Sequence, residues 1–316
     1  PCMAIFKDYL ENKSPLILHG ALGTEMESLG YDISGKLWSA KYLLEKPEVI
    51  QKIHETYVAA GADLITTSSY QATLPGLIDA GLTKEESEQI IASTVQLAKN
   101  ARDKVWATLD DSEKANRPYP LISGDVGPYA AYLANGSEYT GDYGQITIEA
   151  LKEFHRPRIQ ILLDQGVDLL ALETIPNRLE AQALIELLAE EFPEAEAYIS
   201  FTVQEPGTIS DGTSLDEIAQ LVAQSDQILA LGINCSSPLL YNQALTVLKN
   251  AGKALITYPN SGEVYDGSTQ TWKPKDKDAL TLVEHSKDWH AQFGVKILGG
   301  CCRTRPNDIK ALYAEF

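Results

Sequence analysis

The 316-residue sequence is poor in cysteine, in basic residues and in long apolar runs, and each shortage excludes a class of protein. Four cysteines in a chain of this length do not suit the dense disulfide framework of a small secreted domain, so we expect reduced thiols. Lys and Arg number 26 against 44 Asp and Glu, and the net charge of −18 repels nucleic-acid phosphates and anionic membrane surfaces. No apolar stretch approaches the roughly 20 residues that span a bilayer. We therefore expect neither a nucleic acid nor a membrane as a partner.

Targeting and nucleotide-binding signals are also missing. The first residues, Pro1-Cys2-Met3-Ala4-Ile5, lack the basic and then apolar pattern of a secretory signal, which predicts a cytoplasmic protein. No G-x-G-x-x-G follows the first predicted strand, and no G-x-x-x-x-G-K-[ST] occurs, so a nucleotide-binding fold has little support. The fold class must therefore be argued from the hydrophobic pattern.

One junction between a helix and a strand recurs along the chain. A helix-like segment ends at a glycine, which tolerates the left-handed conformation of a helix C-terminus, and an apolar run begins two residues later. This junction occurs at Gly61, Gly166, Gly252 and Gly294. The apolar runs are continuous rather than alternating, which is typical of parallel strands that helices cover. Eight strands are predicted, at 16–19, 64–69, 121–125, 169–173, 197–203, 228–234, 254–258 and 296–298.

The segments between these strands read as helices, and two of them have a recognisable start. Thr83-Lys84-Glu85-Glu86 and Ser214-Leu215-Asp216-Glu217 both have the spacing of a capping box, in which each side chain bonds the other residue's backbone amide. Strands and helices that alternate over the whole length indicate an α/β protein, and eight units favour a (β/α)8 TIM barrel. We therefore predict a single barrel domain over residues 1–316.

The C-terminal ends of the predicted strands carry the candidate functional residues, because active sites of this fold collect there. Three of these residues are cysteines. Cys235 follows the run 228–234, and Cys301 and Cys302 follow the last strand and two glycines, which would let the backbone bend so that both side chains face one ion. Three thiolates predict zinc, and with no fourth interior cysteine the remaining coordination position would be open to water or substrate.

The chemistry of such an ion points to the class of substrate. A zinc ion held by three thiolates is electron-rich and polarises carbonyl groups poorly. It can instead bind a further thiol, lower the pKa of that thiol from about 8.5 to below neutrality, and hold it as a nucleophile. We therefore predict that the substrate is a thiol.

Other interpretations of these cysteines stay open. Each could be a small buried hydrophobic residue. Cys301 and Cys302 could form a redox-active disulfide between neighbours, without any metal. A zinc ion could also be structural, while the barrel performs unrelated chemistry. Thiol titration and metal analysis of freshly reduced protein would separate these possibilities.

The cysteine segments resemble the zinc motif of the homocysteine S-methyltransferase family. The likeness rests on Asn234-Cys235 and on Gly299-Gly300-Cys301-Cys302-Arg303, with further matches at 37–40, 60–73, 127–129, 136–139 and 172–176. It implies a homocysteine-binding barrel, and it is strongest to the stand-alone enzymes that use S-methylmethionine, with S-adenosylmethionine as a poorer donor. Betaine is the alternative donor, although members that use it usually have a longer C-terminal extension.

The resemblance implies a reaction and a metal site. Cys235, Cys301 and Cys302 would bind Zn²⁺, and the sulfur of homocysteine would be the fourth ligand. The homocysteine thiolate would attack the methyl group of the sulfonium donor, and methionine would form. No general base is needed at that step, so the resemblance implies no catalytic side chain beyond the metal-activated thiol of the substrate.

The resemblance also implies how the two small-molecule substrates are held. Glu173 would bind the ammonium group of homocysteine. Thr67 and the backbone amides near Gly20 and Ala21 would help to hold the amino acid. Trp38 would lie near the donor, where an aromatic face stabilises a sulfonium by about 0.5–2 kcal/mol.

One residue departs from the family pattern. Members usually have Asp-Gly at the end of the first strand, where this chain has His19-Gly20. The missing carboxylate leaves Glu173 with more of the recognition of the amino group. His19 itself is either a packing residue at the barrel or, less favoured, a direct participant in catalysis.

Overall fold

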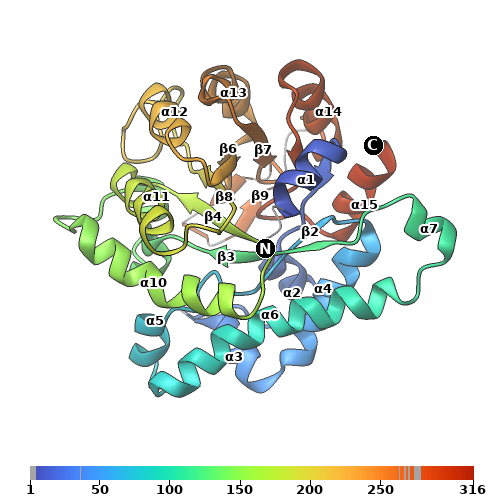
Figure 1. Cartoon of the computed structure of the whole chain (residues 1–316), viewed down its shortest axis with the longest axis horizontal. Coiled ribbons are helices and arrows are strands. Elements are labelled where there is room, and N and C mark those ends of the chain that lie inside the picture. The colour runs from blue at the N-terminus through green and yellow to red at the C-terminus, as the bar shows by residue number, and fades with distance from the viewer. Residues whose placement is uncertain (1–4, 36, 263, 267, 270, 274–278) are drawn as a thin grey trace.

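The computed structural model of the chain describes residues 5–35, 37–262, 264–266, 268–269, 271–273 and 279–316. An eight-stranded parallel sheet lies at its centre, surrounded by helices (Figure 1). The strand order is β1-β10-β7-β6-β5-β4-β3-β2, and a parallel bridge between Leu18 and Leu64 joins the two ends of the sheet. The protein is therefore a (β/α)8 TIM barrel, as the alternation of strands and helices predicts.

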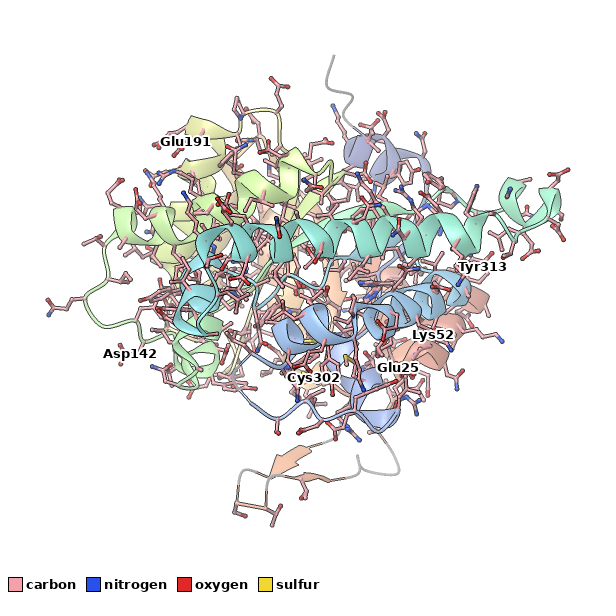
Figure 2. The ribbon with its side chains drawn as sticks, turned by 90° about the horizontal axis from the view of Figure 1, so that it is seen from below. Glu25, Lys52, Asp142, Glu191, Cys302 and Tyr313 are labelled. Carbon is pink, nitrogen blue, oxygen red and sulfur yellow. A yellow bond between two sulfur atoms is a disulfide. The ribbon has the colours of Figure 1, made fainter. Side chains whose placement is uncertain are left out.

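All eight predicted strands are confirmed, and the predictions at 228–234 and 254–258 have the observed bounds. An antiparallel hairpin, β8 (Val264–Asp266) with β9 (Thr271–Lys273), was not predicted and projects from the body of the molecule (Figure 2). The barrel strands are β1 (Leu16–Ile17), β2 (Leu64–Thr66), β3 (Leu121–Val126), β4 (Leu169–Ile175), β5 (Ala197–Phe201), β6 (Ile228–Asn234), β7 (Ala254–Tyr258) and β10 (Ile297–Leu298).

Helices cover the outside of the barrel, and Figure 2 shows the long α6 lying along α4. The helices between successive barrel strands, and after the last, are α4 (Pro47–Ala60), α6 (Lys84–Trp106), α10 (Ile148–Asp164), α11 (Arg178–Glu191), α12 (Leu215–Ala223), α13 (Tyr241–Leu248), α14 (Leu282–Phe293) and α15 (Pro306–Glu315). Shorter helices are α1 (Ile5–Asn12), α2 (Leu22–Ser28), α3 (Trp38–Glu45), α5 (Leu74–Asp79), α7 (Asp111–Ala115), α8 (Tyr129–Leu133), α9 (Ser137–Thr140), η1 (Pro238–Leu240) and η2 (Lys249–Ala251).

The two largest apolar clusters of the described residues hold the barrel together. The larger one fills the space between the strands and the outer helices. The smaller one fills the barrel interior, where inward-facing residues such as Leu64 and Leu169 pack with Phe6 and Leu10 of α1. Helix α1 closes the barrel interior at the N-terminal ends of the strands. Open space for a ligand is therefore left at the C-terminal ends of the strands.

The local sequence signals are confirmed in large part. The four junction glycines, Gly61, Gly166, Gly252 and Gly294, all have positive φ, between 66° and 113°. The capping box at Thr83 forms in both directions, since Glu86 N donates to Thr83 Oγ1 and Thr83 N donates to Glu86 Oε1.

The second predicted capping box is only half formed. Ser214 Oγ accepts a hydrogen bond from Glu217 N at 3.2 Å. The Glu217 carboxylate forms no return bond and instead pairs with Arg178 Nε at 3.5 Å. The prediction of a reciprocal pair at Ser214 is therefore wrong, because a cation on α11 competes for the carboxylate.

Among the helices of the described residues, none combines the length and apolar character needed to cross a membrane.

Candidate active site

A cavity of about 390 Å³ lies at the C-terminal ends of the barrel strands. Its volume suits small-molecule substrates. The C-terminal ends of β3, β4 and β7 and the segments that follow β1, β2, β6 and β10 contribute to its wall. Every residue that the sequence predicts for the site lines this one cavity: Gly20, Ala21, Trp38, Thr67, Glu173, Cys235, Cys301 and Cys302.

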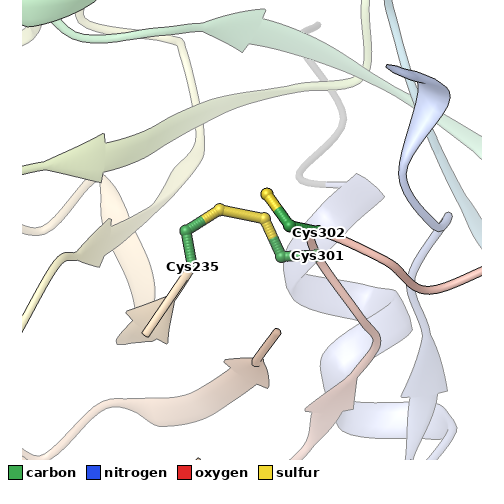
Figure 3. Close-up of side chains that lie close together, drawn as sticks. All are labelled: Cys235, Cys301 and Cys302. Atoms are coloured by element: carbon green, nitrogen blue, oxygen red, sulfur yellow. A yellow bond between two sulfur atoms is a disulfide. The ribbon is translucent and has the colours of Figure 1, made fainter. Parts of the chain in front are cut away.

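The three predicted sulfur ligands converge on one side of the cavity. The Sγ atoms of Cys235, Cys301 and Cys302 lie within 4.8 Å of one another (Figure 3). Cys235 follows β6 and the other two follow β10, and β7 separates these strands in the sheet. Backbone hydrogen bonds to the end of β7 bring both segments together, from Cys235 N to Tyr258 O at 3.3 Å and from Cys301 N to Pro259 O at 2.7 Å.

A disulfide joins Cys235 to Cys301, and Cys302 is a free thiol. The prediction that the interior cysteines are reduced is therefore wrong for two of them in this structure. The alternative pairing of Cys301 with Cys302 is not found either. The reason is proximity, because the converging strand ends place the Cys235 and Cys301 sulfurs side by side, and neighbouring thiols can oxidise to a disulfide.

Once reduced, this set of sulfurs suits a zinc ion. Thiolates bind zinc at about 2.3 Å in a tetrahedral array, which separates neighbouring sulfurs by about 3.8 Å. All three sulfurs here lie within 4.8 Å of one another, so the zinc geometry needs only that the bonded Cys235 and Cys301 sulfurs move apart on reduction. Burial raises the pKa of the Cys302 thiol, so a bound cation would be needed to stabilise its thiolate.

The backbone at the mouth of the barrel is strained. Three of the four non-glycine residues with positive φ among the described residues line the cavity: Thr174 at 62°, Cys235 at 47° and Arg303 at 65°. Each such conformation costs about 1–3 kcal/mol, and such residues cluster at functional sites. Asn234 holds two of them, because its Oδ1 accepts from Thr174 N and its Nδ2 donates to Cys235 Sγ. The strain therefore fixes the direction in which Cys235 points.

Two carboxyl groups lie on the wall formed by β3 and β4. Glu173 accepts a hydrogen bond from Tyr258 Oη at 3.1 Å, and the carboxyl group of Asp125 is its neighbour. Burial raises the pKa of Glu173, and burial together with the nearby charge of Glu173 raises that of Asp125 well above its usual range. The sequence prediction placed Asp125 at a strand end but gave it no role in the site, although a carboxylate that ends a buried strand is the same signal that identified Glu173.

His19 lines the cavity at the end of β1. Its Nε2 lies 3.1 Å from His54 Nδ1, and its ring packs on the Tyr57 ring with 4.3 Å between centroids. Burial, and then the neighbouring His54, lower the pKa of His19, and burial lowers that of His54 to about 4. Both imidazoles are therefore neutral near pH 7, and the end of β1 supplies no charge to the cavity.

The hydroxyl of Thr67 is already engaged. Thr67 Oγ1 accepts from Asp125 N at 2.9 Å and lies 2.7 Å from Ser69 Oγ. Ser69 donates its own proton to Asp125 O at 2.7 Å, so the proton between the two hydroxyls must come from Thr67. Thr67 therefore has no proton left to donate to a ligand, and its clearest contact is with the backbone of Asp125.

The loop after β1 and the start of α3 complete the wall. Tyr57 Oη donates to Ala21 O at 2.7 Å, and the Tyr57 ring lies so close to Gly20 that a Cβ there would come within 2.5 Å of it. This contact requires glycine at position 20. Trp38, the first residue of α3, is partly exposed and lies against Gly23 at the cavity rim.

Comparisons with known proteins agree with this geometry. A family model described as homocysteine S-methyltransferase matches residues 16–316. The homocysteine S-methyltransferase YbgG of Bacillus subtilis (strain 168) is 44% identical over 301 residues, which are 95% of this chain and 93% of that protein.

Solved structures are similar over the same extent. The metallated form of the homocysteine methyltransferase MmuM from Escherichia coli matches with a TM-score of 0.86 and 41% identity, over 98% of this chain and 99% of that chain. The oxidized form of the same enzyme matches with the same TM-score, identity and coverage.

Proposed function

This chain belongs to the homocysteine S-methyltransferase family and is a homocysteine S-methyltransferase, and from that premise we propose its donor and its metal. The methyl group would come from S-methylmethionine, with S-adenosylmethionine as a poorer donor. The metal would be zinc, held by Cys235, Cys301 and Cys302. The product would be methionine. Residues 1–316 would act as one homocysteine-binding domain.

The convergence of three sulfurs at the mouth of the substrate cavity is the observation that carries this proposal. Zinc, when bound, lowers the pKa of a coordinated thiol and keeps it as a thiolate. The metallated form of the related E. coli enzyme supports a metal here, and the existence of an oxidized form of that enzyme supports an oxidised state of this chain as well. The Cys235–Cys301 disulfide must be reduced before a metal binds, which suits a reducing compartment such as the cytoplasm.

The remaining site residues would bind and orient the amino acid. Glu173 would accept hydrogen bonds from the ammonium group of homocysteine, and the backbone amides near Gly20 and Ala21 would help to hold the rest of the amino acid. Thr67 would act indirectly, by fixing the wall on which Glu173 lies, because its hydroxyl is engaged with Asp125 and Ser69. Holding two reactants in one orientation removes most of the entropic barrier of a bimolecular step.

Trp38 at the rim would face the sulfonium of the donor. Its aromatic face stabilises a positive charge by about 0.5–2 kcal/mol, and this attraction ends when the leaving thioether becomes neutral. The new bond forms between the homocysteine sulfur and the methyl carbon. The donor's bond to that carbon breaks, and its electron pair stays on the departing sulfur. With S-methylmethionine, both products are methionine.

The size of the cavity favours the smaller donor. About 390 Å³ is suited to two molecules of amino-acid size, whereas the adenosyl group of S-adenosylmethionine would extend toward the rim.

A methyl-transfer assay tests donor and metal together. Reduced, zinc-loaded enzyme is given homocysteine with S-methylmethionine, S-adenosylmethionine or betaine, with and without a chelator. We expect methionine to form fastest from S-methylmethionine and chelation to abolish its formation.

Three outcomes would count against the proposal. Turnover that survives complete removal of zinc would reject the metal. Faster turnover with betaine or S-adenosylmethionine would reject the donor. Full activity of the protein with the Cys235–Cys301 bond intact would show that these sulfurs do not take part.

A further inference from the structure

We propose that Asp125 is a second carboxylate for the ammonium group of homocysteine, which would bind between Asp125 and Glu173. The inference rests on the proposed function, because it takes the cavity as the homocysteine site and Glu173 as a ligand of the ammonium. It adds a binding residue on β3 that neither the sequence pattern nor the comparisons assign. The argument starts from the position of the two carboxyl groups.

Asp125 and Glu173 lie on neighbouring strands and on the same cavity wall. In the register of β3 and β4, Asp125 stands opposite Ala171, and Glu173 lies two residues further along β4, on the same face. The side chain of Asp125 is almost fully buried, with 5% of the residue exposed. Its Oδ1 atom receives no hydrogen bond from a donor among the described residues.

A buried carboxylate oxygen without a donor is costly, and here its neighbour is a second carboxyl group. The two groups can hydrogen-bond to each other only by sharing a proton, because two adjacent buried carboxylates repel. An ammonium group brings one positive charge and three N–H donors. It could therefore satisfy both carboxylates at once and take the place of the shared proton.

Among the described residues, no cationic side chain donates hydrogen bonds to both carboxyl groups. The guanidinium of Arg158 is the cation that acts on both carboxyl groups, but only through space. Its terminal nitrogens donate to backbone carbonyls, NH1 to Ser69 O and Tyr70 O, and NH2 to Gly127 O at 2.7 Å. Arg158 therefore fixes the loops behind the carboxyl pair, and the face of the pair toward the cavity is left for a ligand.

The backbone of Asp125 is held on both sides before any ligand arrives. Thr67 Oγ1 accepts from Asp125 N, and Ser69 Oγ donates to Asp125 O. A carboxylate on a fixed backbone loses little conformational freedom when a ligand binds, which increases affinity. His19 is neutral, and Glu27, the other acidic residue of the cavity wall, is exposed and pairs with Arg303 NH1 at 3.7 Å, so β3 and β4 are the favoured source of the charge that balances the ammonium.

The test replaces Asp125 with its isosteric amide and compares ligands that differ in the ammonium group. We expect Asp125→Asn to raise the KM for homocysteine about 10- to 100-fold, the usual effect of losing one hydrogen bond to a charged group. The KM for S-methylmethionine should change less than about twofold. Inhibition by 4-sulfanylbutanoate, which is homocysteine without its ammonium, should not change. Asp125→Glu should recover part of the affinity.

A matched control comes from the same strand. Ser123 lies two residues before Asp125 on the same face of β3, and its buried Oγ forms no hydrogen bond among the described residues. Ser123→Ala should leave both KM values unchanged. If Ser123→Ala raises the KM for homocysteine as much as Asp125→Asn does, the effect is a general disturbance of the strand, and the proposal is overturned.

A second measurement does not depend on any variant folding. In a crystal structure of the wild-type enzyme with homocysteine, the ammonium nitrogen should lie within about 3.2 Å of carboxylate oxygens of both Asp125 and Glu173. A nitrogen that contacts Glu173 alone would overturn the inference. An unchanged homocysteine KM in Asp125→Asn, with an active wild-type enzyme, would refute this inference and leave the proposed function standing. A wild-type enzyme that does not methylate homocysteine would instead refute the proposed function.

Discussion

Two clusters of acidic side chains lie close to each other, and they differ in how many hydrogen-bond donors surround their carboxyl groups. Behind the barrel, Glu180 of α11 accepts from Tyr143 Oη at 2.6 Å and from Tyr129 N at 2.7 Å, and its Oε2 lies 2.8 Å from His155 Nε2. At the mouth of the barrel, Asp125 and Glu173 have mainly each other and the hydroxyl of Tyr258. Glu180 and Asp125 are both buried, so burial alone does not mark a binding site.

Unfilled hydrogen-bonding capacity is what marks the binding site. The Glu180 cluster is complete, and its role is to fasten α10, α11 and the loop after β3 to one another. The mouth cluster has the Tyr258 hydroxyl as a donor and Arg158 as a cation that acts only through space, so an amino acid would bring further donors and a positive charge in direct contact. We therefore expect substitutions in the two clusters to separate into losses of stability and losses of function.

The largest effect should follow removal of a sulfur ligand. Cys301→Ser should bind zinc poorly and lose about 1000-fold or more in activity, because a metal ligand contributes more than the outer-shell partners, whose loss costs 10- to 100-fold. The reduced variant should keep nearly the thermal stability of the reduced wild type, since the site lies above the packed core. Metal analysis, the methyl-transfer assay and thermal melting measure these quantities. A variant that retains zinc and activity would show that Cys301 is not a ligand.

A substitution in the Glu180 cluster should lower stability and leave substrate binding unchanged. Glu180→Ala leaves His155 and Tyr143 buried without their partner and should lower the free energy of unfolding by about 3 kcal/mol. The folded fraction should keep a homocysteine KM close to that of the wild type. Urea unfolding and the assay, each corrected for folded protein, test this. A stable variant with a raised KM would mean that this cluster belongs to the site as well.

Glu173→Gln should weaken homocysteine binding without lowering stability, and the change in free energy should be somewhat smaller than for Glu180→Ala. The KM for homocysteine should rise about 30-fold, or about 2 kcal/mol, because an amide attracts an ammonium far less than a carboxylate does. Stability at pH 7 should not fall and should rise slightly, since one of two repelling carboxyl groups is removed. Kinetics and urea unfolding of the same preparation provide both numbers. A large loss of stability would place Glu173 with the structural cluster.

The smallest effect should come from the rim. Trp38→Leu removes an aromatic face but keeps an apolar side chain, so the KM for S-methylmethionine should rise about 2- to 30-fold, as expected for a cation–π contact of 0.5–2 kcal/mol. The KM for homocysteine should change little. Trp38→Phe should show a smaller loss than Trp38→Leu. Equal losses for both substitutions would indicate that Trp38 acts through packing rather than through its π electrons.

The sequence predicted the parts of the site that depend on single strands. Each strand end was readable from an apolar run that stops at a polar residue, so Glu173 and Cys235 were found and do line the cavity. One contact between strands, the convergence of Cys235 with Cys301 and Cys302, was predicted from the chemistry of the three thiols. Nothing in the chain near Asp125 shows that it lies beside Glu173, and nothing shows that Cys235 and Cys301 form a disulfide.

The same limit applies to the outer layer. The capping box at Ser214 was predicted from local spacing, but Arg178 on another helix takes up the carboxylate of Glu217. The cluster of Glu180 and His155 joins two helices at positions that no local pattern relates. Local signals therefore predict elements and their ends, while the partners of long polar side chains depend on the packed structure.

The coordination of the metal tests the central claim most directly. X-ray absorption at the zinc edge of reduced, zinc-loaded protein should show three sulfur ligands and one lighter atom, and four sulfur ligands after homocysteine is added. In Cys301→Ser the sulfur count should fall. Zinc whose sulfur count does not change when homocysteine is added would contradict the account, because the ion would then be structural and the substrate thiol would be activated elsewhere.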